Sequence, residues 1–220
     1  MDYQAILHRV DHTLLKPEAT WPQVQALCDE AVEMKTASVC ISPCFAAQAR
    51  DYLAGRLPIC TVIGFPSGAV TTRLKMLEAQ DAMENGAAEL DMVINIGFAK
   101  EGRWEALSSE LRALREVTAG FVLKVIVEMC LLTREEKLRL CGLVAEAQAD
   151  YMKTSTGFST GGATVEDIRL MRENLPPFVK VKASGGIRSF QDGQVMLEAG
   201  ADRLGASALV PLAKQEMGLR

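Results

Sequence analysis

Short, mostly apolar runs recur along the chain and alternate with longer segments that mix apolar and polar residues. Strands of a parallel sheet are covered on both faces, so they are apolar at nearly every position. Several of the runs are also rich in β-branched residues, as strands are. They predict eight strands, at residues 11–14, 38–42, 60–64, 89–95, 123–128, 150–154, 179–183 and 202–205.

The segments between these runs have a helical repeat. Apolar side chains that recur at three- and four-residue steps lie on one face of a helix. Helix start signals agree, because Thr20 with Gln23 and Thr133 with Glu136 have the spacing of a capping box. The repeat is clear in Val24, Leu27, Ala31 and Met34, and again in Trp104, Leu107, Leu111 and Leu114.

Strands that alternate with helices indicate parallel pairing. Eight such units form either a closed barrel or a doubly wound open sheet. No Gly-x-Gly-x-x-Gly follows the first strand, which disfavours the dinucleotide-binding form of the open sheet. We therefore predict an α/β fold in which residues 1–220 form a single (β/α)8 TIM barrel with parallel strands.

A weak internal repeat refines this prediction. Segments 84–91, 146–153 and 198–205 can be written in one register, and segment 33–40 is a looser copy. Each copy leads from a helix end through a tight turn into strand two, four, six or eight, and alternate strands of this barrel contribute side chains to one interior layer. The last positions of the four copies are Cys40, Asp91, Lys153 and Gly205. We expect Asp91 and Lys153 to face each other.

Two lysines lie where catalytic groups gather in such barrels, at the C-terminal ends of the strands. Lys153 opens Lys-Thr-Ser-Thr-Gly-Phe, and Lys182 opens Lys-Ala-Ser-Gly-Gly-Ile-Arg. A lysine in a buried strand is costly unless it has a partner or a task. Structural ion pairs would explain either lysine alone. Two lysines on neighbouring strands with Asp91 nearby favour a catalytic site.

The chemistry of such a cluster is specific. An amine attacks a carbonyl only when it is unprotonated, and a free lysine titrates near ~10.4. A second ammonium nearby disfavours the charged form, and so does burial. One lysine can then be the nucleophile and the other its electrostatic neighbour. A carboxylate such as Asp91 can hold the second lysine charged and relay protons through water.

Glycine-rich turns follow strands seven and eight. One contains Gly185 and Gly186, and the other contains Gly205 and Ser207. Barrels commonly bind phosphate at these two places through backbone N–H groups, although ordinary strand-to-helix turns have similar composition. The loop that contains Gly157 adds a third flexible segment, and it lacks the Gly-Lys-Ser/Thr of a nucleotide-binding P-loop.

Composition narrows the class of protein. The net charge is −4, without the basic stripe expected for nucleic acid or an anionic membrane. The N-terminus lacks a secretion signal, and no apolar run approaches the roughly 20 residues that cross a bilayer, so we expect a cytoplasmic protein. Six cysteines without a Cys-x-x-Cys pair, and only two histidines, disfavour a disulfide framework or a metal site. We expect no metal and no cofactor.

With these residues identified, the sequence resembles the deoxyribose-phosphate aldolase family along almost its whole length. The lysine motifs that begin at Lys153 and Lys182, in this order, are highly specific. The other matching segments are 11–16, 39–43, 61–66, 89–97, 124–128 and 205–207.

The resemblance implies reversible cleavage of 2-deoxy-D-ribose 5-phosphate into D-glyceraldehyde 3-phosphate and acetaldehyde by a metal-independent Schiff-base aldolase, with a homodimer as the family's assembly. It implies that Lys153 forms the Schiff base, that Lys182 perturbs it and that Asp91 joins the proton relay. The implied substrate pocket contains Asp11, Thr13, Cys40 and Thr156. The implied phosphate site contains Gly157, Gly185, Gly186, Gly205 and Ser207.

The chain departs from some members of the family at three places. Ala208 replaces the second serine of the last phosphate turn, Phe158 stands where some members have lysine, and the chain ends without a tyrosine. Three alternatives remain at this point. They are a Schiff-base barrel aldolase with a different aldehyde donor, a phosphate-binding barrel without catalysis, and a metal-dependent aldolase, which would need more converging ligands than this sequence offers.

Overall fold

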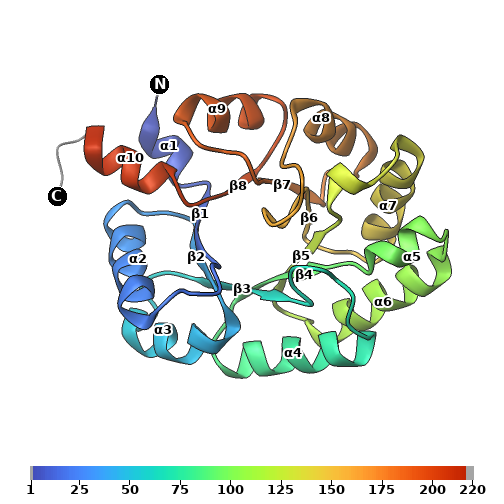
Figure 1. Cartoon of the computed structure of the whole chain (residues 1–220), viewed down its shortest axis with the longest axis horizontal. Helices are drawn as coiled ribbons and strands as arrows, with labels where there is room; N and C mark the ends of the chain where they lie inside the picture. The colour runs from blue at the N-terminus through green and yellow to red at the C-terminus, as the bar shows by residue number, and fades with distance from the viewer. Residues whose placement is uncertain (1, 217–220) are drawn as a thin grey trace.

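Eight parallel strands close into a barrel, and helices surround it (Figure 1). The structure is a computed structural model that describes residues 2–216. Each strand pairs with the next along the chain, and β8 pairs with β1. The predicted (β/α)8 barrel is therefore confirmed. The strands are β1 (Val10–Leu14), β2 (Ser38–Ile41), β3 (Ile59–Ile63), β4 (Glu89–Val93), β5 (Val122–Ile126), β6 (Tyr151–Lys153), β7 (Lys180–Ser184) and β8 (Arg203–Ala206).

The predicted strands match the observed ones to within two residues at each end. The prediction runs too far at the ends of β4 and β5, and the cause is local. Asn95 is the N-cap of the helix that follows β4, and its side chain accepts a hydrogen bond from the N–H of Phe98. Glu128 follows β5 in the left-handed region, at φ 57°, which ends the extended backbone.

Helices fill the connections, as the three- and four-residue repeats predict. The capping box at Thr133 is present, since its N–H donates to Glu136 at 2.7 Å and its hydroxyl accepts from the N–H of Glu136 at 3.3 Å. The α-helices are α1 (Tyr3–Leu7), α2 (Trp21–Glu33), α3 (Ala46–Leu53), α4 (Thr72–Glu84), α5 (Ile96–Lys100), α6 (Trp104–Val117), α7 (Arg134–Glu146), α8 (Val165–Asn174), α9 (Phe190–Glu198) and α10 (Leu209–Glu216). Short 3-10 helices η1 (Pro43–Phe45) and η2 (Met129–Leu131) follow β2 and β5.

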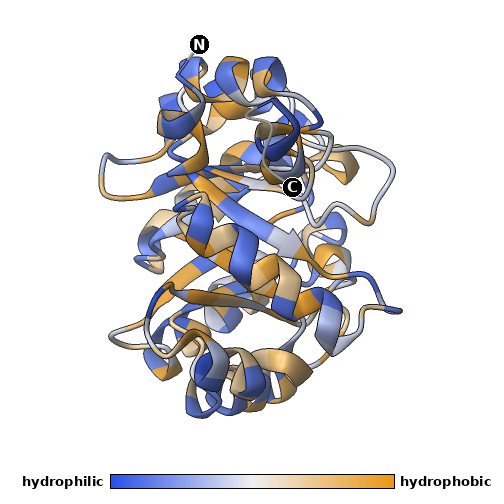
Figure 2. Cartoon of the chain, turned by 90° about the vertical axis from the view of Figure 1, so that its left-hand side faces the viewer, coloured by the Kyte–Doolittle hydropathy of each residue, from blue (hydrophilic) through white to orange (hydrophobic). Residues whose placement is uncertain are grey.

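The strands pack an apolar layer against the helices. Leu90, Met92, Val125 and Met152 are fully buried members of this layer. Hydrophilic and hydrophobic residues alternate along the surrounding helices, because one face of each helix contacts the barrel (Figure 2). The strand residues between these apolar positions point into the barrel, and there the chain places charged side chains instead of a purely apolar filling.

A buried ion pair outside the barrel joins two helices to the end of β4. Lys75 of α4 is fully buried and donates to Glu110 of α6 at 2.9 Å and to the carbonyl of Val93 at 2.8 Å. Glu110 also accepts from the N–H of Asn95 at 3.1 Å. Burial lowers the pKa of Lys75, and the charge of Glu110 opposes that effect. The pair therefore fixes how α4 and α6 pack beside the barrel.

Removing the lysine should destabilise the fold strongly. In Lys75→Met the carboxylate of Glu110 stays buried without its cation, and breaking a buried pair in this way costs about 3–5 kcal/mol. Urea unfolding should show a lower midpoint with an unchanged slope. The double variant Lys75→Met/Glu110→Leu should recover part of the loss, because no lone charge is left. An unchanged midpoint in Lys75→Met would show that the pair contributes nothing.

Candidate active site

Three lysines converge on one carboxylate inside the barrel. Asp91 Oδ2 accepts from Lys153 Nζ at 2.7 Å and from Lys182 Nζ at 2.6 Å, while Asp91 Oδ1 accepts from Lys124 Nζ at 2.8 Å. All four side chains are buried, and Lys153 is the most exposed of them at 3%. The structure thus brings together the three residues that the sequence picked out as catalytic candidates, and it adds a third lysine.

The strand register explains this convergence. Lys153 of β6 and Lys182 of β7 are paired residues on neighbouring strands, and so are Asp91 of β4 and Lys124 of β5. Side chains at every second position point inward, so one register error would turn each of them toward the helices. The expectation that Asp91 and Lys153 face each other agrees with their contact.

Asp11 lies on the other side of Lys182. Its Oδ2 accepts from Lys182 Nζ, and its Oδ1 accepts from the hydroxyl of Ser38 at 2.8 Å and from Arg203 at 2.6 Å. Asp11 has no exposed surface. Asp11, which the resemblance assigned to the substrate pocket, therefore contacts Lys182 and does not line the pocket above Lys153.

Four residues that were not predicted to belong to the site also take part in this cluster: Lys124, Glu89, Arg203 and Cys60. The thiol of Cys60 donates to Asp91 Oδ1 at 3.1 Å. Lys124 lies in an apolar strand run, the same signal that drew attention to the other two lysines. A buried lysine in such a run was therefore a detectable site candidate. Arg203 and Glu89 meet at 3.3 Å, and only the three-dimensional register shows that they do.

The charges in this interior balance without Lys153. Three carboxylates face three cations that each contact at least two of them, whereas Lys153 contacts only Asp91. The pairs are Lys124 with Glu89 (2.6 Å), Asp91 (2.8 Å) and Asp11 (3.7 Å), Lys182 with Asp11 and Asp91 (2.6 Å), and Arg203 with Asp11 (2.6 Å) and Glu89 (3.3 Å). Lys153 is therefore the amine that the network needs least as a cation.

The same contacts set two protonation states. Burial would raise the pKa of Asp91, but the charges of Lys124, Lys153 and Lys182 outweigh burial and hold that pKa well below its usual value. Burial would lower the pKa of Lys182, but the carboxylates of Asp11 and Asp91 raise it above the ordinary lysine value. Asp91 is therefore held as a carboxylate, and Lys182 is held as an ammonium.

A pocket of about 280 Å³ opens above Lys153. It extends from this amine to the turns that follow β7 and β8. Two cationic side chains, Lys16 and Arg188, also line it and were not among the predicted site residues. Of the predicted site residues, those that line the pocket are Thr13, Lys153, Thr156, Gly157, Gly185, Gly186, Gly205 and Ser207. Cys40 lies deeper, is 1% exposed and does not line it.

The glycines of the pocket have a backbone that other residues rarely adopt. Gly185 and Gly186 have φ of 80° and 79°, in the left-handed region. A Cβ on nearby Gly162 would lie 2.3 Å from the carbonyl oxygen of Gly185, so this loop packs directly on the turn. The turn after β7 therefore depends on glycine both for its shape and for its contact with the preceding loop.

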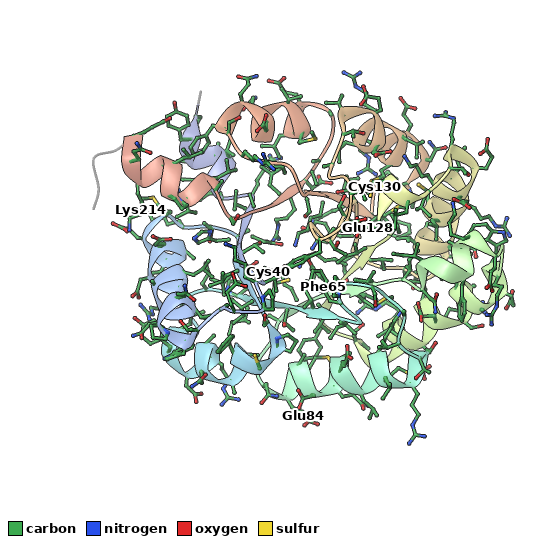
Figure 3. The ribbon with its side chains drawn as sticks, in the orientation of Figure 1. Cys40, Phe65, Glu84, Glu128, Cys130 and Lys214 are labelled. Carbon is green, nitrogen blue, oxygen red and sulfur yellow. The ribbon has the colours of Figure 1, made fainter. Side chains whose placement is uncertain are left out.

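Thr156 borders the pocket, but its polar groups are directed elsewhere. Its hydroxyl and its N–H both donate to the buried carboxylate of Glu128, which lies beside Cys130 in Figure 3. The hydroxyl also accepts from the N–H of Phe158 at 3.1 Å. Thr156 therefore holds the loop after β6 in place, and Glu128 is the residue that fixes Thr156.

Phe158 lines the pocket and packs against a second aromatic residue. Phe158 is 50% exposed, and its ring meets that of Phe65 edge-on, with ring centroids 5.3 Å apart. Phe65 lies near the middle of the ring of strands in Figure 3. The positive charge that some relatives place at position 158 is absent, but Lys16 and Arg188 supply two cations to the same pocket.

Two groups of buried side chains could offer metal ligands within residues 2–216. The groups are Cys40 with Cys60 and Asp91, and Asp11 with Cys60 and Glu89, with ligand atoms within 4.8 Å of one another in each. The carboxylates of both groups already carry ion pairs to lysine or arginine, and these positive charges would repel a metal cation. The donor set fits an ion-pair network better than a metal centre.

Two further observations concern the chain ends and membranes. Residues 217–220, where some relatives carry a tyrosine, lie outside the described residues. Within residues 2–216, no helix combines the length and the apolar character needed to span a bilayer.

Comparison with known proteins identifies the family of the chain. The sequence model of the DeoC/LacD family of aldolases matches residues 4–219. The deoxyribose-phosphate aldolase of Clostridioides difficile is 48% identical over 211 residues, which are 96% of each chain, and that of Clostridium botulinum is 48% identical over 216 residues, 98% of each. The tetrameric deoxyribose phosphate aldolase of Aeropyrum pernix superposes with a TM-score of 0.90 at 32% identity, covering 99% of this chain and 94% of the other. This chain belongs to the DeoC/LacD family of aldolases.

Proposed function

We propose that the protein catalyses the reversible cleavage of 2-deoxy-D-ribose 5-phosphate into D-glyceraldehyde 3-phosphate and acetaldehyde through a Schiff base on Lys153. One observation carries this proposal. Among residues 2–216, Lys153 is the lysine that both contacts Asp91 and lines the pocket. Its amine can therefore meet a substrate carbonyl on one side and a proton acceptor on the other.

The reaction starts when the neutral amine of Lys153 attacks the aldehyde carbon C1 of the open-chain sugar. Loss of water gives a protonated imine, which serves as the electron sink. A base then removes the proton of the C3 hydroxyl, the C2–C3 bond breaks, and its electron pair forms an enamine on Lys153. Glyceraldehyde 3-phosphate leaves, the enamine is protonated at C2, and hydrolysis of the imine releases acetaldehyde.

Asp91 and Lys182 serve the proton transfers. Asp91 is held as a carboxylate within 2.7 Å of Lys153 Nζ, so it can accept a proton from that amine directly or from the C3 hydroxyl through a water molecule. Lys182 is held as an ammonium on the same oxygen. Its charge disfavours a second ammonium beside it. This supports Lys153 as the nucleophile and Lys182 as its electrostatic neighbour.

The far end of the pocket suits a phosphate. Gly185 and Gly186 present backbone N–H groups in a left-handed turn, and such turns bind anions. Gly205 and Ser207 line the same pocket. The cations of Lys16 and Arg188 add favourable charge to it. A substrate that carries its aldehyde and its phosphate at opposite ends matches this arrangement.

Substitution of the phosphate turn should discriminate between substrates. In Gly186→Leu the left-handed backbone is strained and a side chain enters the pocket, so KM for deoxyribose 5-phosphate should rise at least about tenfold. KM for unphosphorylated deoxyribose should change little. Gly120→Leu is the matched control, because Gly120 has φ 86° and equally open surroundings but does not line the pocket. Equal losses for both sugars would mean that the turn only shapes the fold.

The proposal extends to the setting of the reaction. The family resemblance supports a cytoplasmic enzyme of deoxyribonucleotide breakdown, because that breakdown yields deoxyribose phosphates. It also supports a homodimer, although the relative from Aeropyrum pernix is described as a tetramer. Sedimentation analysis of the purified protein measures the assembly directly.

A further inference from the structure

A buried hydroxyl without a partner lies in the wall of the pocket. Ser184 is 4% exposed, and its Oγ makes no hydrogen bond to the protein. Within residues 2–216, the other buried side-chain atoms without a partner are His12 Nδ1 and Ser155 Oγ, and neither of those residues lines the pocket above Lys153. A buried hydroxyl that bonds nothing is costly and uncommon. Ser184 is therefore a group that a ligand in this pocket can satisfy.

Ser184 lies between the lysines and the turn that follows β7. It is the last residue of β7, two residues beyond Lys182 and one before Gly185. Two residues along a strand advance the chain by roughly 6–7 Å and return to the same face. The hydroxyl of Ser184 therefore lies one layer above Lys182, and the proposed phosphate turn begins at the next residue.

The neighbouring strand leaves this hydroxyl uncovered. Ser184 is paired in register with Gly205 of β8, and a Cβ on Gly205 would lie 2.3 Å from Ser184 Oγ. Any side chain at position 205 would occupy the place of the hydroxyl. The backbone of Ser184 is fixed as well, because its N–H donates to the hydroxyl of Thr154 at 3.1 Å and its carbonyl accepts from the N–H of Ala163 at 3.0 Å. The absence of a side chain at position 205 therefore leaves room for the hydroxyl of Ser184, and the backbone hydrogen bonds fix the position of its residue.

We propose that Ser184 binds the C4 hydroxyl of deoxyribose 5-phosphate, which becomes the C2 hydroxyl of glyceraldehyde 3-phosphate. This inference rests on the proposed function, in which C1 is bound to Lys153 and the phosphate lies on the turn at Gly185. The hydroxyls of C3 and C4 then lie between them. The C3 hydroxyl gives up its proton in the lysine layer, and C4 is one carbon nearer the phosphate, level with Ser184. A serine hydroxyl both donates and accepts, so it suits a neutral hydroxyl partner.

This contact makes Ser184 a specificity-determining residue for the acceptor aldehyde. A site that hydrogen-bonds a substrate hydroxyl disfavours an analogue that lacks it, because its own polar group is then left unpaired. The enzyme should therefore prefer acceptors with a hydroxyl next to the aldehyde carbon. Phosphate binding alone would not produce this preference.

The test compares two acceptors in the direction of synthesis, with acetaldehyde held constant. One acceptor is D-glyceraldehyde 3-phosphate, and the other is 3-phosphooxypropanal, which keeps the phosphate and lacks the C2 hydroxyl. In Ser184→Ala, kcat/KM for the first acceptor should fall about three- to tenfold, as expected for one neutral hydrogen bond. The value for the second should stay within about twofold of wild type on the same scale. The control Ser155→Ala removes a hydroxyl that is equally buried and unpartnered but not in the pocket wall, and it should change neither value.

Each outcome decides the question. Equal losses for both acceptors, or no loss for either, would overturn the assignment of Ser184 to the C4 hydroxyl. A wild-type enzyme that does not join acetaldehyde to glyceraldehyde 3-phosphate would overturn the proposed function, and this inference with it. The deoxy acceptor also serves as an internal control for folding, because a damaged pocket would lower its rate as well.

Discussion

Borohydride reduction of the enzyme in the presence of acetaldehyde should leave an ethyl group on Lys153. The imine that forms there is reduced to a stable secondary amine. Trypsin does not cleave after such a lysine, so the label should appear in a single peptide that spans residues 140–169. That peptide should be heavier by C2H4, because the ethyl group replaces one hydrogen of the amine. Peptide mass spectrometry reads both the mass and the missed cleavage.

The choice of Lys153 over the other lysines follows from contacts and access. Lys182 and Lys124 are fully buried, and each contacts at least two carboxylates. Burial would lower the pKa of both, but the charges of these carboxylates outweigh burial and raise it. Lys16 lines the pocket but does not contact Asp91. Lys153 lines the pocket and contacts a single carboxylate, which makes it the amine best placed to meet a carbonyl as a neutral group.

Lys153→Arg should abolish turnover and labelling together. A guanidinium keeps the positive charge but stays protonated at every relevant pH, so it has no lone pair to offer. The rate should fall by a factor on the order of 10⁴ or more, as when other enzymes lose a nucleophile. Labelling confined to Lys182 or Lys16 would show that the Schiff base forms on that residue instead. Undiminished turnover in Lys153→Arg would exclude covalent catalysis at position 153.

The fold could be predicted from sequence because most strand residues are apolar. Buried parallel strands need apolar side chains on both faces, and runs such as those of β4 and β5 supply them with only one or two interruptions. The predicted strands extend too far at the ends of β4 and β5, where the backbone leaves the extended conformation for a local reason. Asn95 caps a helix, and Glu128 takes a left-handed conformation that nothing in its own residue type announces.

The candidate site was predictable only in part. The internal repeat placed Asp91 and Lys153 in one layer because it preserves the register from one strand to another. The partners of Asp11 depend on contacts with residues as distant as Arg203, and sequence periodicity does not encode such pairings. The direction of the Thr156 hydroxyl toward Glu128, 28 residues away, is likewise a property of the folded loops.

Lys182 should tune imine formation through its charge, and three proteins test this. Wild type, Lys182→Arg and Lys182→Leu differ in whether a cation shares Asp91 Oδ2 with Lys153. In Lys182→Leu, the ammonium form of Lys153 no longer shares Asp91 Oδ2 with a second ammonium, while Lys124 stays on Asp91 Oδ1. Protonation is then more favourable, so the lone pair appears at higher pH. Trapping should therefore rise at a higher pH than in wild type.

Lys182→Arg keeps a cation at the site, although the larger guanidinium is displaced, so it should retain some trapping, which should rise at a pH near that of wild type. Lys182→Leu removes one cation that Asp11 and Asp91 share and leaves them Lys124 in common. If that variant unfolds, Lys182→Leu/Asp11→Asn removes one of the two carboxylates and keeps the experiment possible. The measurement is the rate of borohydride trapping with acetaldehyde at each pH. Coincident profiles in all the proteins would show that Lys182 does not act on Lys153 by its charge, and its contact with Asp91 would then serve only to hold that carboxylate in place.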